Sequence, residues 1–343
     1  MVNNADFIAL KKLVKDQGLL TKQPWHYFGF MVVKLVLLIV CMVMMFTITS
    51  VWFQVINAIF MGFVMGQIAF ISHSACHRQS FNKLWQNDVA ALIFGNFLLG
   101  ISRDWWMLKH NVHHAHPNHD GMDPDLDVPA VAFTEQQALS KQGIWRFIVK
   151  YQAWLFFPLL TLQGYALREV SIRFVFSGKA RQPWLEGLLM AANVVWYLAL
   201  PMIALGPWAG LMFVLISHAV FGVYLGSVFA PNHKGMLIVD DTTEIDYLRL
   251  QVLTARNVRA HALTDFWYGG LNYQIEHHLF PSLPMHRLRP TSLIVQQFCA
   301  ERGVSYAETG VVQSYREILG YLNEIGAPLR NPIAEPERIP QKL

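Results

Sequence analysis

Two long stretches without a charged side chain constrain this chain more than any other feature of its sequence. No Asp, Glu, Lys or Arg occurs among the 43 residues of segment 35–77 or the 47 residues of segment 187–233. About 20 apolar helical residues cross a membrane hydrocarbon core of ~30 Å, so each segment has room for two spans. We therefore predict an all-α membrane protein with four transmembrane helices arranged as two hairpins, over about residues 28–48, 51–72, 188–205 and 208–230.

The distribution of basic residues predicts the orientation of these spans. The turns near residues 49–50 and 206–207 carry no Lys or Arg, whereas eleven lie between Arg78 and Glu186. The N-terminal segment adds Lys11, Lys12, Lys15, Lys22 and Lys34. Because basic residues concentrate on the cytoplasmic side, we expect an integral, multi-pass membrane protein with both termini and the central segment in the cytoplasm. Residues 73–187 and 231–343 then form a cytosolic helical cap, and residues 1–343 a single domain.

Several weaker patterns also carry structural expectations. The uncharged stretches at residues 90–102 and 151–167 are short for a span, so we expect interfacial or re-entrant helices there. Helix-like stretches are expected near residues 242–258 and 311–325, before a Pro-rich tail from Pro332. The second and fourth spans contain glycines four residues apart, which predicts close helix packing; these are Gly62 with Gly66 and Gly222 with Gly226.

Composition excludes several classes of function. The chain is 54% hydrophobic and only 15% charged, which is too apolar for an ordinary soluble domain. A net charge of +4 without a basic run gives no reason to expect nucleic-acid binding. Three cysteines, none in a C-x-x-C spacing, cannot form a disulfide framework. Histidine is the more informative residue type, because most of the 14 histidines cluster in short polar segments.

Three of these segments have the spacing of metal-binding motifs. They are His73-Ser-Ala-Cys-His77, His110-Asn-Val-His113-His114 and Gln274-Ile-Glu-His277-His278. On a helix, residues three or four apart share one face, so each motif presents its imidazoles together. Neutral imidazole binds iron, zinc or copper, and seven histidines are more than one tetrahedral ion uses. The number of histidines therefore predicts two metal ions. The alternative is a solvated patch of surface histidines.

The three motifs, placed beside two helical hairpins, resemble the histidine boxes of the membrane fatty-acid desaturases. The neighbouring sequence agrees, in Lys109-His-Asn-Val-His-His-Ala-His-Pro-Asn118 and in Gly269-Gly-Leu-Asn-Tyr-Gln-Ile-Glu-His-His-Leu-Phe-Pro281. From about Trp25 to Leu288 the chain is similar to the acyl-CoA and front-end branch, in which glutamine opens the third box. The resemblance implies an O2-dependent enzyme with two iron ions that introduces a double bond into a fatty-acyl chain. That chain is carried on CoA, on acyl-carrier protein or in a lipid.

Rival functions share part of this pattern. A hydroxylase or a triple-bond-forming acetylenase would use the same ligand motifs on the same substrates. A metal-binding membrane transporter or sensor would instead place ionisable ligands within the spans, where only His218 lies. We expect His218 to be either a packing residue or a functional one.

The resemblance also assigns ligands position by position. The expected iron ligands are His73, His77, His110, His113, His114, His233, His277 and His278. Gln274 is either a direct ligand or acts through water or a hydrogen bond, because an amide oxygen is a poorer iron ligand than imidazole. Nearby carboxylates are expected either to orient ligand histidines or to cap their loop; these are Asp120, Asp123, Asp125 and Asp127.

The source of electrons follows from a motif that this sequence lacks. Many front-end desaturases carry a fused cytochrome domain marked by His-Pro-Gly-Gly, and these four residues do not occur together here. We therefore expect a separate electron donor such as a ferredoxin, a rubredoxin or a flavin reductase. Its expected docking surface is basic and includes Arg256, Arg259, Arg287 and Arg289.

Overall fold

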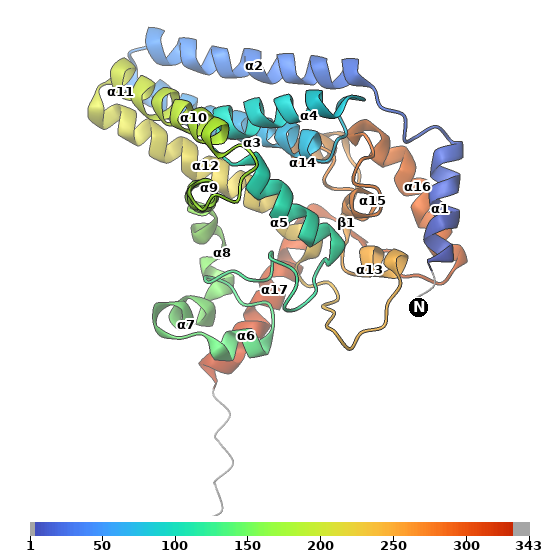
Figure 1. Ribbon diagram of the computed structural model, residues 1–343. Helices are drawn as coiled ribbons and strands as arrows, with labels where there is room; N and C mark the ends of the chain where they lie inside the picture. Colours follow the sequence, from blue (N-terminus) through green and yellow to red (C-terminus); the bar gives the residue numbers. More distant parts are fainter. Residues whose placement is uncertain (1–3, 332–343) are drawn as a thin grey trace, which may run out of the picture.

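The computed structural model describes residues 4–331 and contains four helical segments long and apolar enough to cross a membrane. They are α2 (Pro24–Thr47), α3 (Val51–Cys76), the continuous run Pro183–Leu205, and α12 (Pro207–His233) (Figure 1). The run consists of α10 (Pro183–Val194), the π-helical turn η2 (Val195–Ala199) and α11 (Leu200–Leu205). The expectation of a mainly helical membrane protein with four candidate spans is confirmed.

Local sequence explains where these helices begin and end. Proline occupies the first turn of α2, α10 and α12, where its missing N–H would have no helical partner in any case. Gly206, between α11 and α12, has a φ of 83°, a conformation that glycine adopts without a Cβ clash. The sharp reversal between these two helices therefore depends on this residue.

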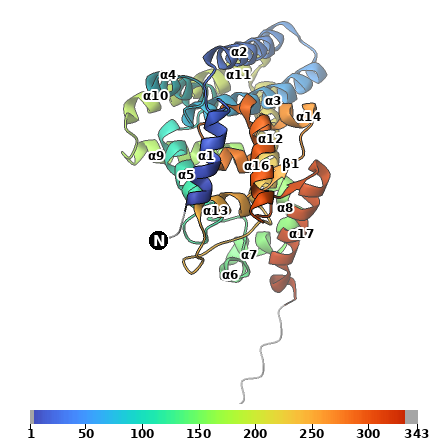
Figure 2. The same cartoon turned by 90° about the vertical axis from the view of Figure 1, so that its right-hand side faces the viewer.

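The helices α3 and α12 form the centre of the apolar region. Both are mostly buried (61% of each span), whereas only 28% of α2 and 22% of the α10–α11 run is buried. The helix α3 packs against α12, α2 packs against α3, and α11 packs against α12 (Figures 1 and 2). The central pair is thus the platform on which the remaining elements assemble.

Glycine permits the close approach of the two central helices. A Cβ on Gly62 would lie 2.5 Å from the Ser217 carbonyl oxygen, and one on Gly66 would overlap the ring of Tyr224. On the other side of α12, a Cβ on Gly222 would overlap the Leu160 carbonyl. The predicted close helix packing is therefore confirmed as packing within the chain.

Shorter elements surround one end of this platform. They are α1 (Ala5–Asp16), α4 (Leu84–Ala91), η1 (Leu92–Phe97), α5 (Arg103–Ala115), α6 (Glu135–Ser140), α7 (Gly143–Lys150), α8 (Gln152–Leu160), α9 (Gln163–Phe176), α13 (Tyr247–Leu253), α14 (Ala262–Tyr268), α15 (Gln274–Leu279), α16 (Met285–Glu301) and α17 (Val311–Arg330). The strands β1 (Asn257–Val258) and β2 (Glu308–Thr309) form one short parallel pair. The helices expected near residues 242–258 and 311–325 correspond to the shorter α13 and to α17. The Pro-rich tail lies outside the described residues.

The two weaker apolar stretches are also largely helical. Residues 90–102 comprise the end of α4, η1 and a buried turn that leads into α5. Residues 151–167 comprise α8 and the start of α9, with the junction between them packed on Gly222 of α12. Their placement at or within a membrane interface stays a prediction.

The glycine contact gives a first test. Gly66→Ala should destabilise the protein by about 1–3 kcal/mol, because the added methyl overlaps Tyr224 in a tightly packed interface. The control is Gly29→Ala in α2, where no atom lies within 4 Å of the new Cβ. That change should be neutral or stabilising by up to about 1 kcal/mol. Thermal unfolding in detergent distinguishes the two, and equal effects would contradict close packing at Gly66.

Candidate metal centre

Eight histidines from four elements remote in sequence meet at one end of the central helices. His73 lies in the last turn of α3, and His77 is the residue directly after the end of that helix. His233 is the last residue of α12. The helix α5 carries His110, His113 and His114, and α15 carries His277 and His278. All eight side chains are buried. The structure thus brings together every histidine predicted as a ligand, and ligation itself stays a prediction.

Four of these histidines form a first group. The ligand atoms of His73, His77, His110 and His277 all lie within 4.8 Å of one another. The Nε2 atoms of His73 and His110 are 3.0 Å apart. The rings of His77 and His277 meet edge to face with centroids 4.7 Å apart.

Three others form a second group, and His114 lies between the two. The ligand atoms of His113, His233 and His278 also lie within 4.8 Å of one another. In this group the Nε2 atoms of His233 and His278 are 3.0 Å apart. His114 has its Nε2 3.2 Å from that of His110 in the first group, and its ring stacks on His278 with centroids 4.2 Å apart.

The donor set fits two metal ions. The His77 Nε2 and both ring nitrogens of His277 are buried and have no hydrogen-bond partner within the described residues 4–331. Buried polar atoms without partners are costly, and a cation that accepts imidazole lone pairs would satisfy His77 Nε2 and one of the two His277 nitrogens. Two groups of neutral nitrogen donors are suited to iron, zinc or copper rather than to magnesium or calcium.

Burial keeps these imidazoles in the form that binds metals. Removal from water disfavours the charged imidazolium and places the pKa of His110 well below its usual range, and the neighbouring His114 adds to this effect. Burial likewise lowers the pKa values of His77, His277 and His278, and neighbouring histidines add to the effect in each case. The lone pairs of these rings are therefore free of protons at neutral pH.

Three ligand candidates are oriented by a hydrogen bond at the opposite ring nitrogen. The Nδ1 of His233 donates to the Thr254 carbonyl at 2.9 Å, and that of His278 donates to Gln251 Oε1 at 3.0 Å. The Nδ1 of His113 lies 3.0 Å from both carboxylate oxygens of Asp123. A proton fixed on Nδ1 leaves the Nε2 lone pair directed at the group.

Asp123 is held in place by its own loop. Its carboxylate also accepts the backbone N–H groups of Asn118 and Asp125, both at 2.8 Å. Burial acts to raise the pKa of this carboxyl, but the hydrogen bond and charge of His113 outweigh it, so the pKa lies below its usual range. Asp123 therefore makes both contacts that were expected of this loop, one to a histidine and one to the loop backbone, and its orienting role toward a metal ligand stays a prediction.

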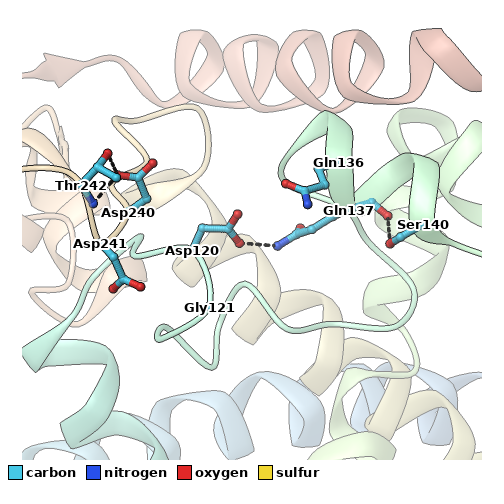
Figure 3. A pocket seen from close by; sticks show the side chains of 8 residues that line it. All are labelled: Asp120, Gly121, Gln136, Gln137, Ser140, Asp240, Asp241 and Thr242. Carbon is cyan, nitrogen blue, oxygen red and sulfur yellow. Dashed lines mark hydrogen bonds between the residues drawn. The ribbon is translucent and has the colours of Figure 1, made fainter.

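The other three predicted aspartates differ from Asp123. The carboxylate of Asp125 lies 3.6 Å from His113 Nδ1 and forms an ion pair with Lys109. Asp120 accepts from Gln137 at 3.1 Å and lines an open hollow with Asp240 and Asp241, not with any of the eight histidines (Figure 3). Asp127 is exposed. An orienting role was therefore the wrong expectation for Asp120, and no described contact supports one for Asp127.

Gln274 faces the second group through its amide nitrogen. Its Nε2 lies 3.0 Å from His233 Nε2, and its Oε1 accepts from Asn232 Nδ2 at 2.9 Å. Because the His233 proton is held on Nδ1, the Gln274 amide lies at the nitrogen of this ring that carries the lone pair. A metal bound to His233 would take the place of this hydrogen bond, and the choice between direct ligation by Gln274 and a hydrogen-bonding role stays a prediction.

Other residues expected to be functional lie outside the centre. His218 is fully buried in α12, where its Nδ1 is 2.9 Å from the Tyr197 hydroxyl, which supports a packing role. Arg256 is also buried, pairs with Glu317 and donates to the Pro231 carbonyl. The prediction that Arg256 lies on an exposed docking surface was therefore wrong. Arg259 and Arg289, from the same predicted surface, are exposed.

The sequence did not identify several residues that position the ligands. Gln251, Thr254 and Asn232 each contact a predicted ligand or Gln274, yet none lies within a histidine motif. Gln251 additionally donates to the His114 carbonyl at 3.0 Å, so one side chain joins α13 to both α5 and α15. A glutamine among the apolar residues Leu248, Leu250, Val252 and Leu253 was the signal that the sequence offered for Gln251.

Comparisons with known proteins agree with this arrangement. The profile of the fatty acid desaturase family matches residues 50–310. The chain is 32% identical over 319 residues to the "Delta(5) fatty acid desaturase fat-4" of Caenorhabditis elegans, covering 88% of this chain and 70% of that protein. It is 30% identical over 290 residues to the "Acyl-lipid (9-3)-desaturase" of Physcomitrium patens, covering 80% of this chain. It spans 54% of the length of that moss protein.

The contact between Asp123 and His113 gives a second test. Asp123→Asn keeps the shape of the side chain but removes its charge, so metal affinity should fall about 10–100-fold. The matched control is Asp127→Asn, on the exposed part of the same loop, which should bind metal as the unaltered chain does. Competition with a chelator measures both, and an unchanged affinity in Asp123→Asn would contradict the orienting role.

Proposed function

The chain belongs to the fatty acid desaturase family, and from this premise we propose that it uses O2 and two iron ions to introduce a double bond into a fatty-acyl chain. The observation that carries the proposal is the pair of adjoining, buried histidine groups at the shared end of α3 and α12. Bound iron would supply, with O2, the oxidising chemistry that removes two hydrogens from an unactivated methylene pair.

The chain's own residues divide the proposed binding between two positions. One iron would be held by His73, His77, His110 and His277. The other would be held by His113, His233 and His278, while His114 lies between the groups and is close enough to either. The anchors at Asp123, Thr254 and Gln251 keep the second set in one orientation.

Apolar residues beside the centre support an acyl substrate. The indole of Trp106 stacks on His110 with ring centroids 4.9 Å apart, and Phe229 lies next to it at 6.3 Å. Such a wall excludes water and offers apolar contacts to a hydrocarbon chain. We propose that the acyl chain reaches the centre along this wall, whether it is carried on CoA, on acyl-carrier protein or in a lipid.

The proposed membrane topology follows from the charges. The ends of α3 and α12 that carry histidines adjoin the segments rich in Lys and Arg, which favours a cytoplasmic site and cytoplasmic termini. The spans then form two hairpins, and the remaining helices a cytosolic cap within one domain. A ferredoxin, rubredoxin or flavin reductase would deliver electrons at this side, near the exposed Arg259 and Arg289.

Metal analysis tests the centre directly. Purified full-length protein should contain about two iron ions per chain, and a His277→Ala, His278→Ala double variant should lose most of them, because each group loses one donor. His26→Ala removes an exposed histidine and should leave the content unchanged. Mass spectrometry for metals provides the measurement. Folded protein without metal above background would contradict the proposed centre.

Product analysis tests the reaction. Iron-loaded protein supplied with reductant, O2 and acyl substrates should release a product that has lost the mass of two hydrogens. The double variant should release none. A product that gains one oxygen would identify a hydroxylase instead, and a triple bond formed from an existing alkene would identify an acetylenase.

A further inference from the structure

The short helix α14 has an apolar face that residues 4–331 leave exposed. Leu263 is 72% exposed, Phe266 52% and Trp267 42%, although the helix has only seven residues. Exposed arginines flank this face, Arg259 just before the helix and Arg289 on α16. An apolar face bordered by cations is typical of a helix that lies in a membrane interface.

The helix α14 is fixed to the two central helices. The Phe266 carbonyl accepts from Gln67 Nε2 at 3.3 Å, and the Trp267 carbonyl accepts from the Tyr224 hydroxyl at 2.6 Å. Its C-cap Gly269 packs on Phe70 of α3, which a Cβ would approach to 2.5 Å. Both views show α14 beside α3 (Figures 1 and 2). Gln67 precedes His73 by six residues, so α14 lies about 9 Å along the helix axis from that histidine.

The buried ammonium group of Lys34 lies next to α14. Lys34 lies in α2, is only 3% exposed, and has its Nζ 4.5 Å from the centroid of Phe30 and 5.3 Å from that of Phe266. Within residues 4–331 no carboxylate pairs with it. Gln67, which donates to the Phe266 carbonyl, has a buried Oε1 with no hydrogen-bond partner in the same part of the chain.

We propose that α14 lies in the cytoplasmic leaflet and that Lys34 binds the phosphate of a membrane phospholipid beside it. The ammonium has aromatic neighbours but no counter-ion, and lipid phosphate is the anion present at an interface. The exposed faces of α14 and of α2, where Phe28 is 54% exposed, place acyl chains next to the same point. A free phosphate ion would lack these apolar contacts. The inference concerns lipid binding and is independent of the reaction.

Lipid titration tests the role of Lys34. Native mass spectrometry of the detergent-purified full chain, titrated with short-chain phosphatidylglycerol, should show about fivefold weaker binding for Lys34→Met, since one basic residue near a membrane surface contributes about that much. Lys34→Arg should retain binding. Lys12→Met removes an equal charge from an exposed position on α1, and this variant should bind as the unaltered chain does. Inorganic phosphate should not compete.

The outcomes separate a lipid site from its rivals. Equal binding by folded Lys34→Met and the unaltered chain would overturn the proposal and leave only the cation–π contacts. Equal losses in Lys34→Met and Lys12→Met would indicate bulk electrostatics and also overturn it. Full competition by inorganic phosphate would identify a free-ion site in place of a lipid site.

A label on α14 tests its position without relying on the stability of Lys34 variants. A fluorophore attached at Leu263→Cys, in bilayer discs, should be quenched by lipids with a spin label near the headgroup and shielded from a soluble quencher. Ile8→Cys places the label on α1, at another exposed aliphatic position, and should show the reverse. The native cysteines Cys41, Cys76 and Cys299 are buried. Equal access of the soluble quencher to both labels would overturn the placement of α14.

Discussion

The arrangement of eight buried imidazoles around one region is the constraint on which the rest of the structure depends. The Nε2 lone pairs of His233 and His278 face each other at 3.0 Å and repel one another in the absence of a cation, so the surrounding chain must hold the rings together. Three kinds of contact do so. Glycines set the spacing of α3 and α12, outer hydrogen bonds fix individual rings, and the buried Gln251 joins the helices that carry the second and third motifs. Each element therefore contributes to the site through its position as well as its histidines.

A buried carboxylate performs a similar task at the start of α5. Glu186 of α10 has no exposed surface and accepts from Ser102, from Asn96 Nδ2 at 3.0 Å and from the backbone N–H of Asp104 at 3.2 Å. Ser102 is the N-cap of α5 and accepts the Trp105 N–H at 3.1 Å. The helix with the second histidine motif is thereby tied at its first turn to a candidate spanning helix. Buried polar groups satisfied in this way restrict the number of arrangements open to the core.

The sequence predicted the features that are encoded locally. Charge-free segments give helices of spanning length, and histidines three or four apart share a helical face, so the four candidate spans and the histidine motifs needed no tertiary knowledge. His233 stands alone in sequence, and only the resemblance identified it. Thr254, Asn232 and Gln251 could not be predicted, because their importance arises from contacts between segments 21 to 42 residues apart. Arg256 was misjudged for the same reason, since its burial depends on Glu317, which is 61 residues away.

The glycine contact between α3 and α12 has a mechanical consequence. His73 and His77 extend from one helix into the first group, and His233 extends from the other into the second group. A shift of one helix along the other by a single residue would change the separation of the groups by about 1.5 Å. Gly62 and Gly66 seat Ser217 and Tyr224 so closely that such sliding would drive atoms together. The distance between the two groups therefore stays the same when the bilayer thickness changes. The outer helices can adjust to such a change by tilting.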